Sequence, residues 1–368
     1  MIADRLPAAR ANRFTGLPRS FAAILLLLLA ASLLTGLVSG GQVATAVDAS
    51  ARVQDGLVGD HALYADVLHR VEAGESYYAA VAAEHRAHHY PLRPFFAVRL
   101  PTLMHLVAAI GLPATQLLSL LVGLAAICAW RVRLRSELDS RLAADLAALL
   151  VAVNLWQLVE RDWILIHEVV AGALIALALA LHRPRRPWAA MIVLSAALSI
   201  RETVLPVAML FGLFALCDRD WRAVAGWLAV GLMFVAGLGM HLSAVAAATT
   251  AADAASPGWM GMGGWATYVA FLRETSILRF APAWVAATLV PLALLGWAGW
   301  KSRLGLAGFG VHSTYALLLM VAARPDNFYW GMLIAPSLFI GLVFAPAALL
   351  ALVRSLLHPG VSVSSAAV

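Results

Sequence analysis

Long apolar runs, separated by short polar stretches, organise most of this chain. The runs cover residues 21–40, 112–130, 142–158, 163–181, 188–200, 204–216, 223–248, 282–300, 304–323 and 331–353. A helix needs about 20 apolar residues to cross the hydrocarbon core of a bilayer. The pattern therefore predicts an all-α polytopic membrane bundle of about ten segments, forming one transmembrane domain over residues 1–368.

Two of these runs, 188–200 and 204–216, are too short to cross a bilayer alone, and Arg201 and Glu202 lie between them. They form either one long buried helix or two half-helices that meet at a polar tip inside the membrane. We favour the two half-helices, because a single span would invert every later loop and scatter the basic residues over both sides.

The first run, 21–40, follows four arginines and is open to a second interpretation as a cleaved signal peptide. Its apolar core is long for a signal peptide, and many further runs follow, so we expect a retained first helix.

Positive charge sets the predicted orientation, since short cytoplasmic loops collect arginine and lysine. With the N-terminus in the cytoplasm and alternating segments, most of the 26 basic residues fall on the cytoplasmic side: Arg5, Arg10, Arg13, Arg19, Arg131, Arg133, Arg135, Arg141, Arg183, Arg185, Arg186, Arg219, Arg222, Lys301, Arg303 and Arg354. Both termini are then cytoplasmic. The alanine and arginine bias is typical of a bacterial chain, which predicts the inner membrane.

Composition supports a membrane protein, with 62% hydrophobic and only 12% charged residues, against roughly 25% charged residues in soluble domains. The pI of about 9.8 does not indicate a nucleic-acid partner, because the basic residues lie between apolar runs. The chain also carries no glycine-rich nucleotide-binding fingerprint.

Two outer, periplasmic segments are large, at residues 41–99 and 249–281. The first has an apolar stripe at Tyr64, Val67, Leu68 and Val71. This spacing predicts an amphipathic helix, and we expect amphipathic helices in the segment.

The first outer segment also holds the leading catalytic candidate, Asp60, just beyond the first run. Asp60 either caps the helix that carries Tyr64, or acts at the membrane surface as a base that takes a proton from an acceptor hydroxyl.

Several short motifs resemble the GT-C glycosyltransferases, multi-span enzymes that use polyprenyl-phosphate sugars and include protein O-mannosyltransferases and aminoarabinose transferases. The motifs are Asp60 with Tyr64, then GESYY (74–78), HRAHHYPLRP (85–94), VRLPT (98–102), LSIRET (198–203) and ARPDNFYW (323–330). The resemblance implies transfer of a sugar from a polyprenyl-phosphate donor to a glycan, lipid or protein acceptor. One departure is that His61, and not a second acidic residue, follows Asp60.

The resemblance implies that Asp60 is catalytic and that Arg201 and Arg324 bind the donor phosphate. Supporting roles fall to Tyr64, Glu160, Asp162, Glu202, Asp326, Asn327, His88 and Arg99. Chemistry agrees, because arginine donates two parallel hydrogen bonds to phosphate and stays charged. Charged groups at membrane depth are also costly unless they are used. The alternative is that Arg201–Glu202 and Arg324–Asp326 are structural ion pairs.

Two other groups have open interpretations. Glu160 and Asp162 either supply a second carboxylate for the acceptor or for a divalent cation, Mg²⁺ or Mn²⁺, or form a charged turn. Glu84, His85, His88 and His89 suggest zinc, but their spacing fits no common closed site. We expect surface or phosphate-contacting histidines there.

Two other functions remain possible from the sequence. A transporter or flippase for a lipid-linked or small polar substrate would use Arg201 and Glu202 as a gate inside the membrane. A non-catalytic assembly factor is the third. An enzyme needs Asp60, Arg201 and Arg324 around one outer cavity, whereas a transporter needs a polar lining that continues toward the cytoplasm.

Overall fold

The computed structural model describes residues 12–56, 59–138 and 140–357, and in these ranges every regular element is a helix. Four helices are long and apolar enough to cross a membrane: the Arg19–Ser39 part of α1 (Arg19–Gly56), α5 (Leu112–Glu137), α10 (Trp221–Ala248) and α13 (Arg303–Ala322). A fifth candidate is the bent pair Ala335–Val343 and Ala345–Leu357. The chain is therefore all-helical with helices suited to a membrane.

Shorter helices make up the rest of the described bundle. The α-helices are α2 (Asp60–Glu72), α3 (Tyr77–Ala87), α4 (Thr102–Ile110), α6 (Arg141–Val153), α7 (His167–Leu181), α8 (Trp188–Ile200), α9 (Leu205–Cys217), α11 (Gly264–Glu274), α12 (Ala283–Gly299), α14 (Ala335–Leu338) and α15 (Ala345–Leu357). The 3-10 turns are η3 (Phe95–Ala97), η4 (Trp156–Leu158), η5 (Asp162–Leu165), η6 (Glu202–Val204), η7 (Ile277–Phe280), η8 (Pro325–Leu333) and η9 (Phe339–Val343).

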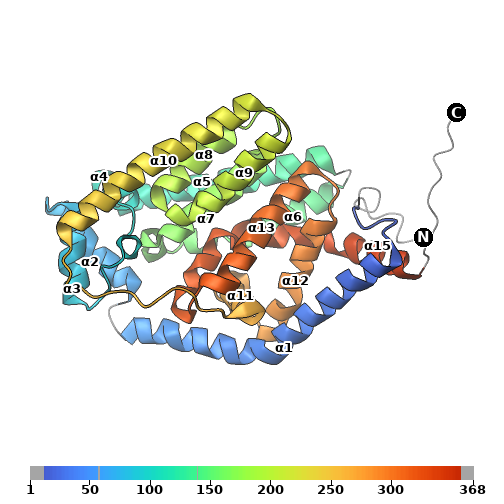
Figure 1. Cartoon of the computed structure of the whole chain (residues 1–368), viewed down its shortest axis with the longest axis horizontal. Coiled ribbons are helices and arrows are strands. Elements are labelled where there is room, and N and C mark those ends of the chain that lie inside the picture. The colour runs from blue at the N-terminus through green and yellow to red at the C-terminus, as the bar shows by residue number, and fades with distance from the viewer. Residues whose placement is uncertain (1–11, 57–58, 139, 358–368) are drawn as a thin grey trace.

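The first helix is longer than the sequence predicted. The first outer segment was expected to begin at residue 41, but α1 continues to Gly56. No proline interrupts residues 41–56, so nothing in the sequence forces the helix to end at the edge of the apolar run. In Figure 1, α1 extends along the bundle from the side of α15 toward α2.

The last predicted span, 331–353, is not one straight helix. The chain passes through η8, α14 and η9 before α15, and the two halves of the candidate span meet at 51°. Pro336 and Pro346 lie in this stretch, and proline cannot donate the backbone hydrogen bond that a continuous helix requires. The single-span prediction is therefore corrected to a broken segment.

The break between 188–200 and 204–216 is confirmed. The backbone of Arg201 is extended, with φ −146° and ψ 117°, and η6 separates α8 from α9. Pro187 before α8 and Asp218 after α9 border the same small pocket, so the two helices run in opposite directions. Arg201 and Glu202 therefore lie at the turn.

The predicted amphipathic helix of the first outer segment is present as α2. Leu63, Tyr64, Val67 and Leu68 are its buried residues, and Val71 packs partly buried against the same core. The opposite face of the helix is mostly exposed. The residues that the sequence predicted to be buried are therefore the ones that pack against the core.

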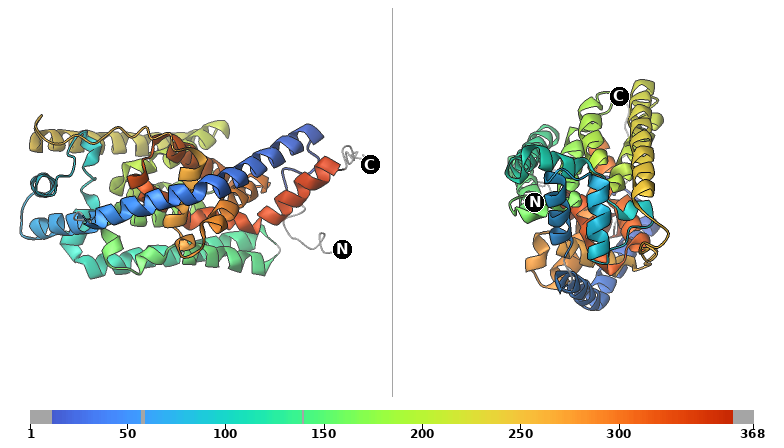
Figure 2. Two further views of the ribbon diagram at one scale, coloured as in Figure 1. Left: turned by 90° about the horizontal axis from the view of Figure 1, so that it is seen from below. Right: turned by 90° about the vertical axis from the view of Figure 1, so that its left-hand side faces the viewer.

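The first predicted outer segment and the last helix lie at opposite ends of the long axis. α2, α3 and α4 lie at one end, and α15 with the start of α1 lies at the other (Figures 1 and 2). At the α15 end, Arg303 pairs with Asp218, and Arg13 donates to the Ser302 carbonyl at 2.7 Å. The predicted cytoplasmic residues Arg5 and Arg10 lie outside the described residues.

Candidate functional site

A cavity of about 580 Å³ lies at the end of the bundle that carries α2 and α3. The predicted site residues that line it are Asp60, Tyr64, Arg99, Arg201, Glu202, Arg324, Asp326 and Asn327. They come from four segments that are far apart in the sequence. Asp60, Arg201 and Arg324 therefore line one cavity.

Asp60 is the first residue of α2, directly after the cap residue Gly59. The cap position belongs to Gly59, so Asp60 is not the N-cap residue and the helix-cap interpretation is wrong in its specific form. The Tyr90 hydroxyl hydrogen-bonds the carboxylate. Burial raises the pKa of Asp60 above its ordinary value and outweighs the lowering by Arg99 and Tyr90. A carboxylate with a raised pKa is a stronger base.

Arg99, for which the resemblance implied only a supporting role, contacts residues of α2, α3 and η8. The Tyr77 hydroxyl donates to the Arg99 carbonyl at 2.8 Å, which fixes the backbone there. The Arg99 guanidinium then donates to the Tyr64 hydroxyl and to the Tyr329 hydroxyl, at 3.0 Å each. These partners are neutral, so the positive charge of Arg99 is not cancelled by them.

Arg201 has charged partners on two sides. Its Nε donates to Glu168 Oε1 at 2.6 Å, and a second nitrogen pairs with Glu202. The Arg201 and Glu168 side chains are each 1% exposed. The ion-pair interpretation of Arg201 and Glu202 is therefore observed, with Glu168 as a further and deeper partner.

Glu168 also faces Arg99, whose terminal nitrogen lies 3.8 Å from Glu168 Oε1. One buried carboxylate is thus shared by two arginines, and this arrangement fixes both guanidinium groups against the cavity wall. Paired and hydrogen-bonded charges are the form in which buried ions are tolerated.

Arg324 also lines the cavity and forms a forked pair with Asp326, at 3.0 and 2.7 Å. A further nitrogen donates to the Pro257 carbonyl at 2.8 Å. The pair with Asp326 is again the structural alternative considered from the sequence. Its side chains remain partly exposed, 20% for Arg324 and 38% for Asp326, so this arginine is open to a ligand.

The two segments that were predicted to be outer contact each other beside the cavity. Arg86 of α3 makes a forked pair with Asp253, at 2.7 and 2.9 Å. The hydrogen bonds from Arg86 hold the pKa of Asp253 well below its usual range. The Leu92 amide donates to the Ala254 carbonyl at 3.0 Å. Pro257 and Trp259 follow Asp253 and Ala254 in the chain, and both line the cavity.

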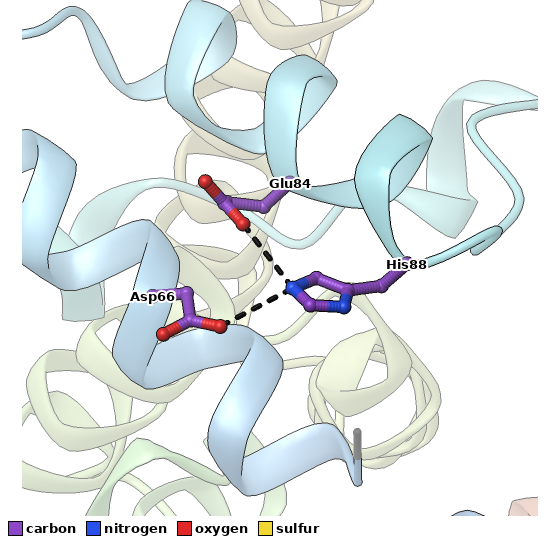
Figure 3. A group of neighbouring side chains, drawn as sticks. All are labelled: Asp66, Glu84 and His88. Atoms are coloured by element: carbon purple, nitrogen blue, oxygen red, sulfur yellow. Dashed lines mark ion pairs between the residues drawn. The ribbon is translucent and has the colours of Figure 1, made fainter. Parts of the chain in front are cut away.

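Three predicted site residues do not line the cavity: Glu160, Asp162 and His88. Glu160 and Asp162 are exposed around the turn between η4 and η5, as expected of a charged turn. His88 faces away, and its Nε2 lies 3.3 Å from both Asp66 and Glu84 (Figure 3).

Sequence reasoning gave no site role to Glu168, Tyr90 or Tyr329, and the two tyrosines line the cavity with His85. Glu168 had a usable signal, because a carboxylate inside an apolar run is costly and marks function. His85 was visible only as one of several histidines. Burial lowers the pKa of His85 to about 4, so its imidazole is neutral near pH 7 and its Nδ1 donates to the Pro91 carbonyl.

An apolar groove of about 440 Å³ adjoins the cavity between α8 and α10. Leu198, Val230, Met233 and Phe234 are among its lining residues. Leu238 lines both the groove and the charged cavity. A ligand with a charged head and an apolar tail could therefore place its head in the charged cavity and its tail in the adjoining apolar groove.

The arrangement combines a carboxylate of raised basicity, guanidinium groups on two walls and an apolar groove. It has the parts needed to deprotonate a hydroxyl beside a bound anion. Comparisons with protein-family models, with curated proteins and with solved structures give no match to this chain.

Proposed function

We propose that this chain is an integral membrane glycosyltransferase of the GT-C type. In this proposal it moves a sugar from a polyprenyl-phosphate donor to an acceptor on the outer, periplasmic face of the inner membrane. The observation that carries the proposal is the junction at Leu238, where the charged cavity with Asp60 and Arg324 meets the apolar groove. A polyprenyl-phosphate sugar has a matching division between charged head and apolar tail.

The transfer assigns one task to each group. The acceptor oxygen forms a bond to the anomeric carbon of the sugar while the bond from that carbon to the phosphate oxygen breaks. Asp60 takes the proton of the acceptor hydroxyl. The polyprenyl phosphate leaves with the bonding electrons, and the arginines stabilise its negative charge.

The contacts favour Arg324 and Arg99 as phosphate ligands over Arg201. Arg99 bonds to two neutral hydroxyls, and Arg324 is partly exposed beside a single carboxylate. Arg201 is buried between Glu168 and Glu202. We therefore propose that Arg201 holds the wall of the site while Arg99 and Arg324 contact the departing phosphate.

The membrane arrangement belongs to the same proposal: about ten segments, both termini cytoplasmic and the cavity periplasmic. The 13 residues of α8 and of α9 give helices of roughly 20 Å, too short for a hydrocarbon core of about 30 Å. An α8–α9 hairpin that enters and leaves on the cytoplasmic side fits these lengths. The placement of α2 and α3 at the opposite end of the long axis from α15 also supports it.

A transporter or flippase is less well supported. It would need polar lining from the cavity toward the end of the bundle that carries α15. Below Glu168, every residue of α7 from Val169 to Leu181 is apolar, and most of them are buried. This wall favours a cavity closed on the cytoplasmic side.

The experiment is in-vitro transfer from a panel of radiolabelled polyprenyl-phosphate sugars to candidate acceptors, using the full chain in membranes. Wild type should transfer label from at least one donor, and Asp60→Asn should transfer it at least about 100-fold more slowly. Glu72→Gln is the matched control, because Glu72 lies on the same helix, is exposed and does not line the cavity. Transfer at the wild-type rate in Asp60→Asn would remove the assigned base. No transfer with any donor, together with movement of a lipid-linked substrate across the bilayer, would favour the transporter.

A further inference from the structure

A second group of charged side chains lies behind the cavity, where α2 packs on α3. Asp66 of α2 faces Glu84 and His88 of α3 (Figure 3). Their ligand atoms, one from each residue, all lie within 4.8 Å of one another. None of the three lines the charged cavity, so the group has no part in the transfer described above.

We propose that Asp66, Glu84 and His88 form a Zn²⁺ site that fastens α2 to α3. The His88 Nε2 atom lies 3.3 Å from Asp66 Oδ2 and 3.3 Å from Glu84 Oε2. Zinc bonds of about 2.0–2.2 Å in tetrahedral geometry place ligand atoms roughly 3.3–3.5 Å apart. The two distances from His88 therefore match edges of a zinc tetrahedron, and the two carboxylate oxygens lie within 4.8 Å of each other.

The charge around the group favours a divalent cation. Asp66, Glu84 and Glu75 bring three negative charges, and Arg70 brings one positive charge through its pairs with Glu84 and Glu75. This leaves two negative charges when His88 is neutral. His88 is also the cap residue at the C-terminal end of α3, where the helix dipole favours a cation.

The surroundings are also those of a metal ligand set. Arg70 binds the Oε1 atom of Glu84, which directs Oε2 toward His88. Such outer contacts orient ligating carboxylates in metal sites. The Asp66 side chain is 49% exposed and that of Glu84 only 11%, so an ion can enter from the Asp66 side and keep a water as its fourth ligand. An imidazole with two carboxylates suits Zn²⁺ better than Mg²⁺, which prefers oxygen ligands alone.

The position of this site gives it a consequence for the cavity. α2 begins with Asp60, and Tyr90, which bonds Asp60, follows shortly after α3. A cation that ties Asp66 to His88 fixes these two helices against each other. The zinc site is inferred without the proposed transferase activity and stands or falls independently of it.

The test is Zn²⁺ titration of the full chain, purified in detergent and stripped of metal with a chelator. Binding is followed by calorimetry, and Co²⁺ serves as a second probe because its absorption reports tetrahedral coordination. Wild type should bind Zn²⁺ with a stoichiometry that falls by one equivalent, or an affinity that weakens at least tenfold, in Asp66→Asn and in His88→Asn. Mg²⁺ should not displace the bound Zn²⁺.

The matched control is His89→Asn, the same substitution one residue along. His89 has a φ of 58°, a conformation that asparagine adopts readily, and it is not part of the cluster. Its Zn²⁺ binding should equal that of wild type. As a check on folding, Zn²⁺ should raise the thermal midpoint of wild type and His89→Asn but not of His88→Asn. Unchanged Zn²⁺ binding in both ligand variants, or no binding to wild type, would show that the three side chains form only a histidine–carboxylate ion pair.

Discussion

At the scale of single residues, the arginines that line the cavity differ in the partners to which they are already bound. Arg201 is hydrogen-bonded to Glu168 and paired with Glu202, whereas Arg99 is hydrogen-bonded to two tyrosine hydroxyls and meets Glu168 only at 3.8 Å. Of these two arginines, Arg99 is the better phosphate ligand, because phosphate binding disturbs a weaker ion pair. Residue identity alone does not distinguish these cases.

The role of Asp60 predicts a specific pH dependence. Asp60→Asn should lower turnover by about 100- to 10,000-fold, the usual contribution of a positioned base. Because burial raises its pKa above the ordinary 3.8, and only the ionised form is a base, wild-type kcat/KM should fall as the pH drops through a value above 3.8. Initial rates measured from pH 4 to 8 test both statements. An acidic limb that persists unchanged in the residual activity of Asp60→Asn would assign the titration to another group.

Arg324 and Arg201 should respond differently to neutralisation. Arg324→Gln should weaken donor affinity as well as rate, since the charge contacts the donor before the transition state too. Arg324→Lys should restore only part of the donor affinity and of the rate, because lysine cannot donate the two parallel hydrogen bonds of a guanidinium. Donor binding by the inserted protein and steady-state kinetics measure this. Wild-type donor affinity in Arg324→Gln would remove this residue from the phosphate site.

Arg201→Gln should instead act mainly on stability. It leaves Glu168 buried with only the more distant Arg99, and breaking such a buried pair costs about 3–5 kcal/mol. Thermal unfolding in detergent should show this loss. Arg324→Gln is the comparison, because a partly exposed pair contributes about 1 kcal/mol or less. Equal thermal midpoints for the two variants would contradict the assignment.

At the scale of elements, close backbone contacts hold the broken last segment in place. A Cβ on Gly296 of α12 would lie 1.8 Å from the Gly341 carbonyl oxygen in η9. Small residues at such points let helices approach closely in membranes. The kink near Gly341 and the glycine of α12 therefore form one packing unit.

Gly296→Ala should separate α12 from η9 and destabilise the chain by about 1–3 kcal/mol, the usual cost of overpacking. Gly231→Ala, in α10, is the matched control, because a Cβ there meets nothing within 4 Å. In a helix interior, alanine is about 0.5–1 kcal/mol more favourable than glycine. Thermal unfolding of both variants gives the comparison, and a neutral Gly296→Ala would mean that the contact relaxes without cost.

At the scale of the whole molecule, the proposed topology predicts which introduced cysteines an impermeant thiol reagent can reach from outside the inner membrane. In a background lacking Cys128 and Cys217, Ala73→Cys should react with an impermeant thiol reagent in intact cells that admit it to the periplasm. Arg186→Cys should react only after the inner membrane is opened. Both positions are exposed. The reverse pattern would invert the orientation and place the cavity in the cytoplasm.

The sequence by itself determined the helical class, the break at Arg201 and the inward face of α2. These follow from apolar runs, a charged pair between two short runs and a stripe at helical spacing, all of which are local properties of the chain. The same local patterns could not show that α1 continues to Gly56 or that the last segment bends. Helix ends and kinks depend on packing and on backbone hydrogen bonds, and hydropathy does not record either.

The candidate site divides in the same way. Arg201 and Arg324 were recognisable because charged residues at the ends of apolar runs are costly and therefore conspicuous, and Asp60 because its motif resembles that of a known family. Only the tertiary structure decided that Glu168 binds Arg201, that Arg99 meets Tyr64 and Tyr329, and that His88 turns away toward Asp66. These contacts join segments far apart in the sequence. Which charge is compensated, and which stays available for a ligand, is therefore settled by three-dimensional proximity, because Coulomb interactions depend on distance in space and not on distance along the chain.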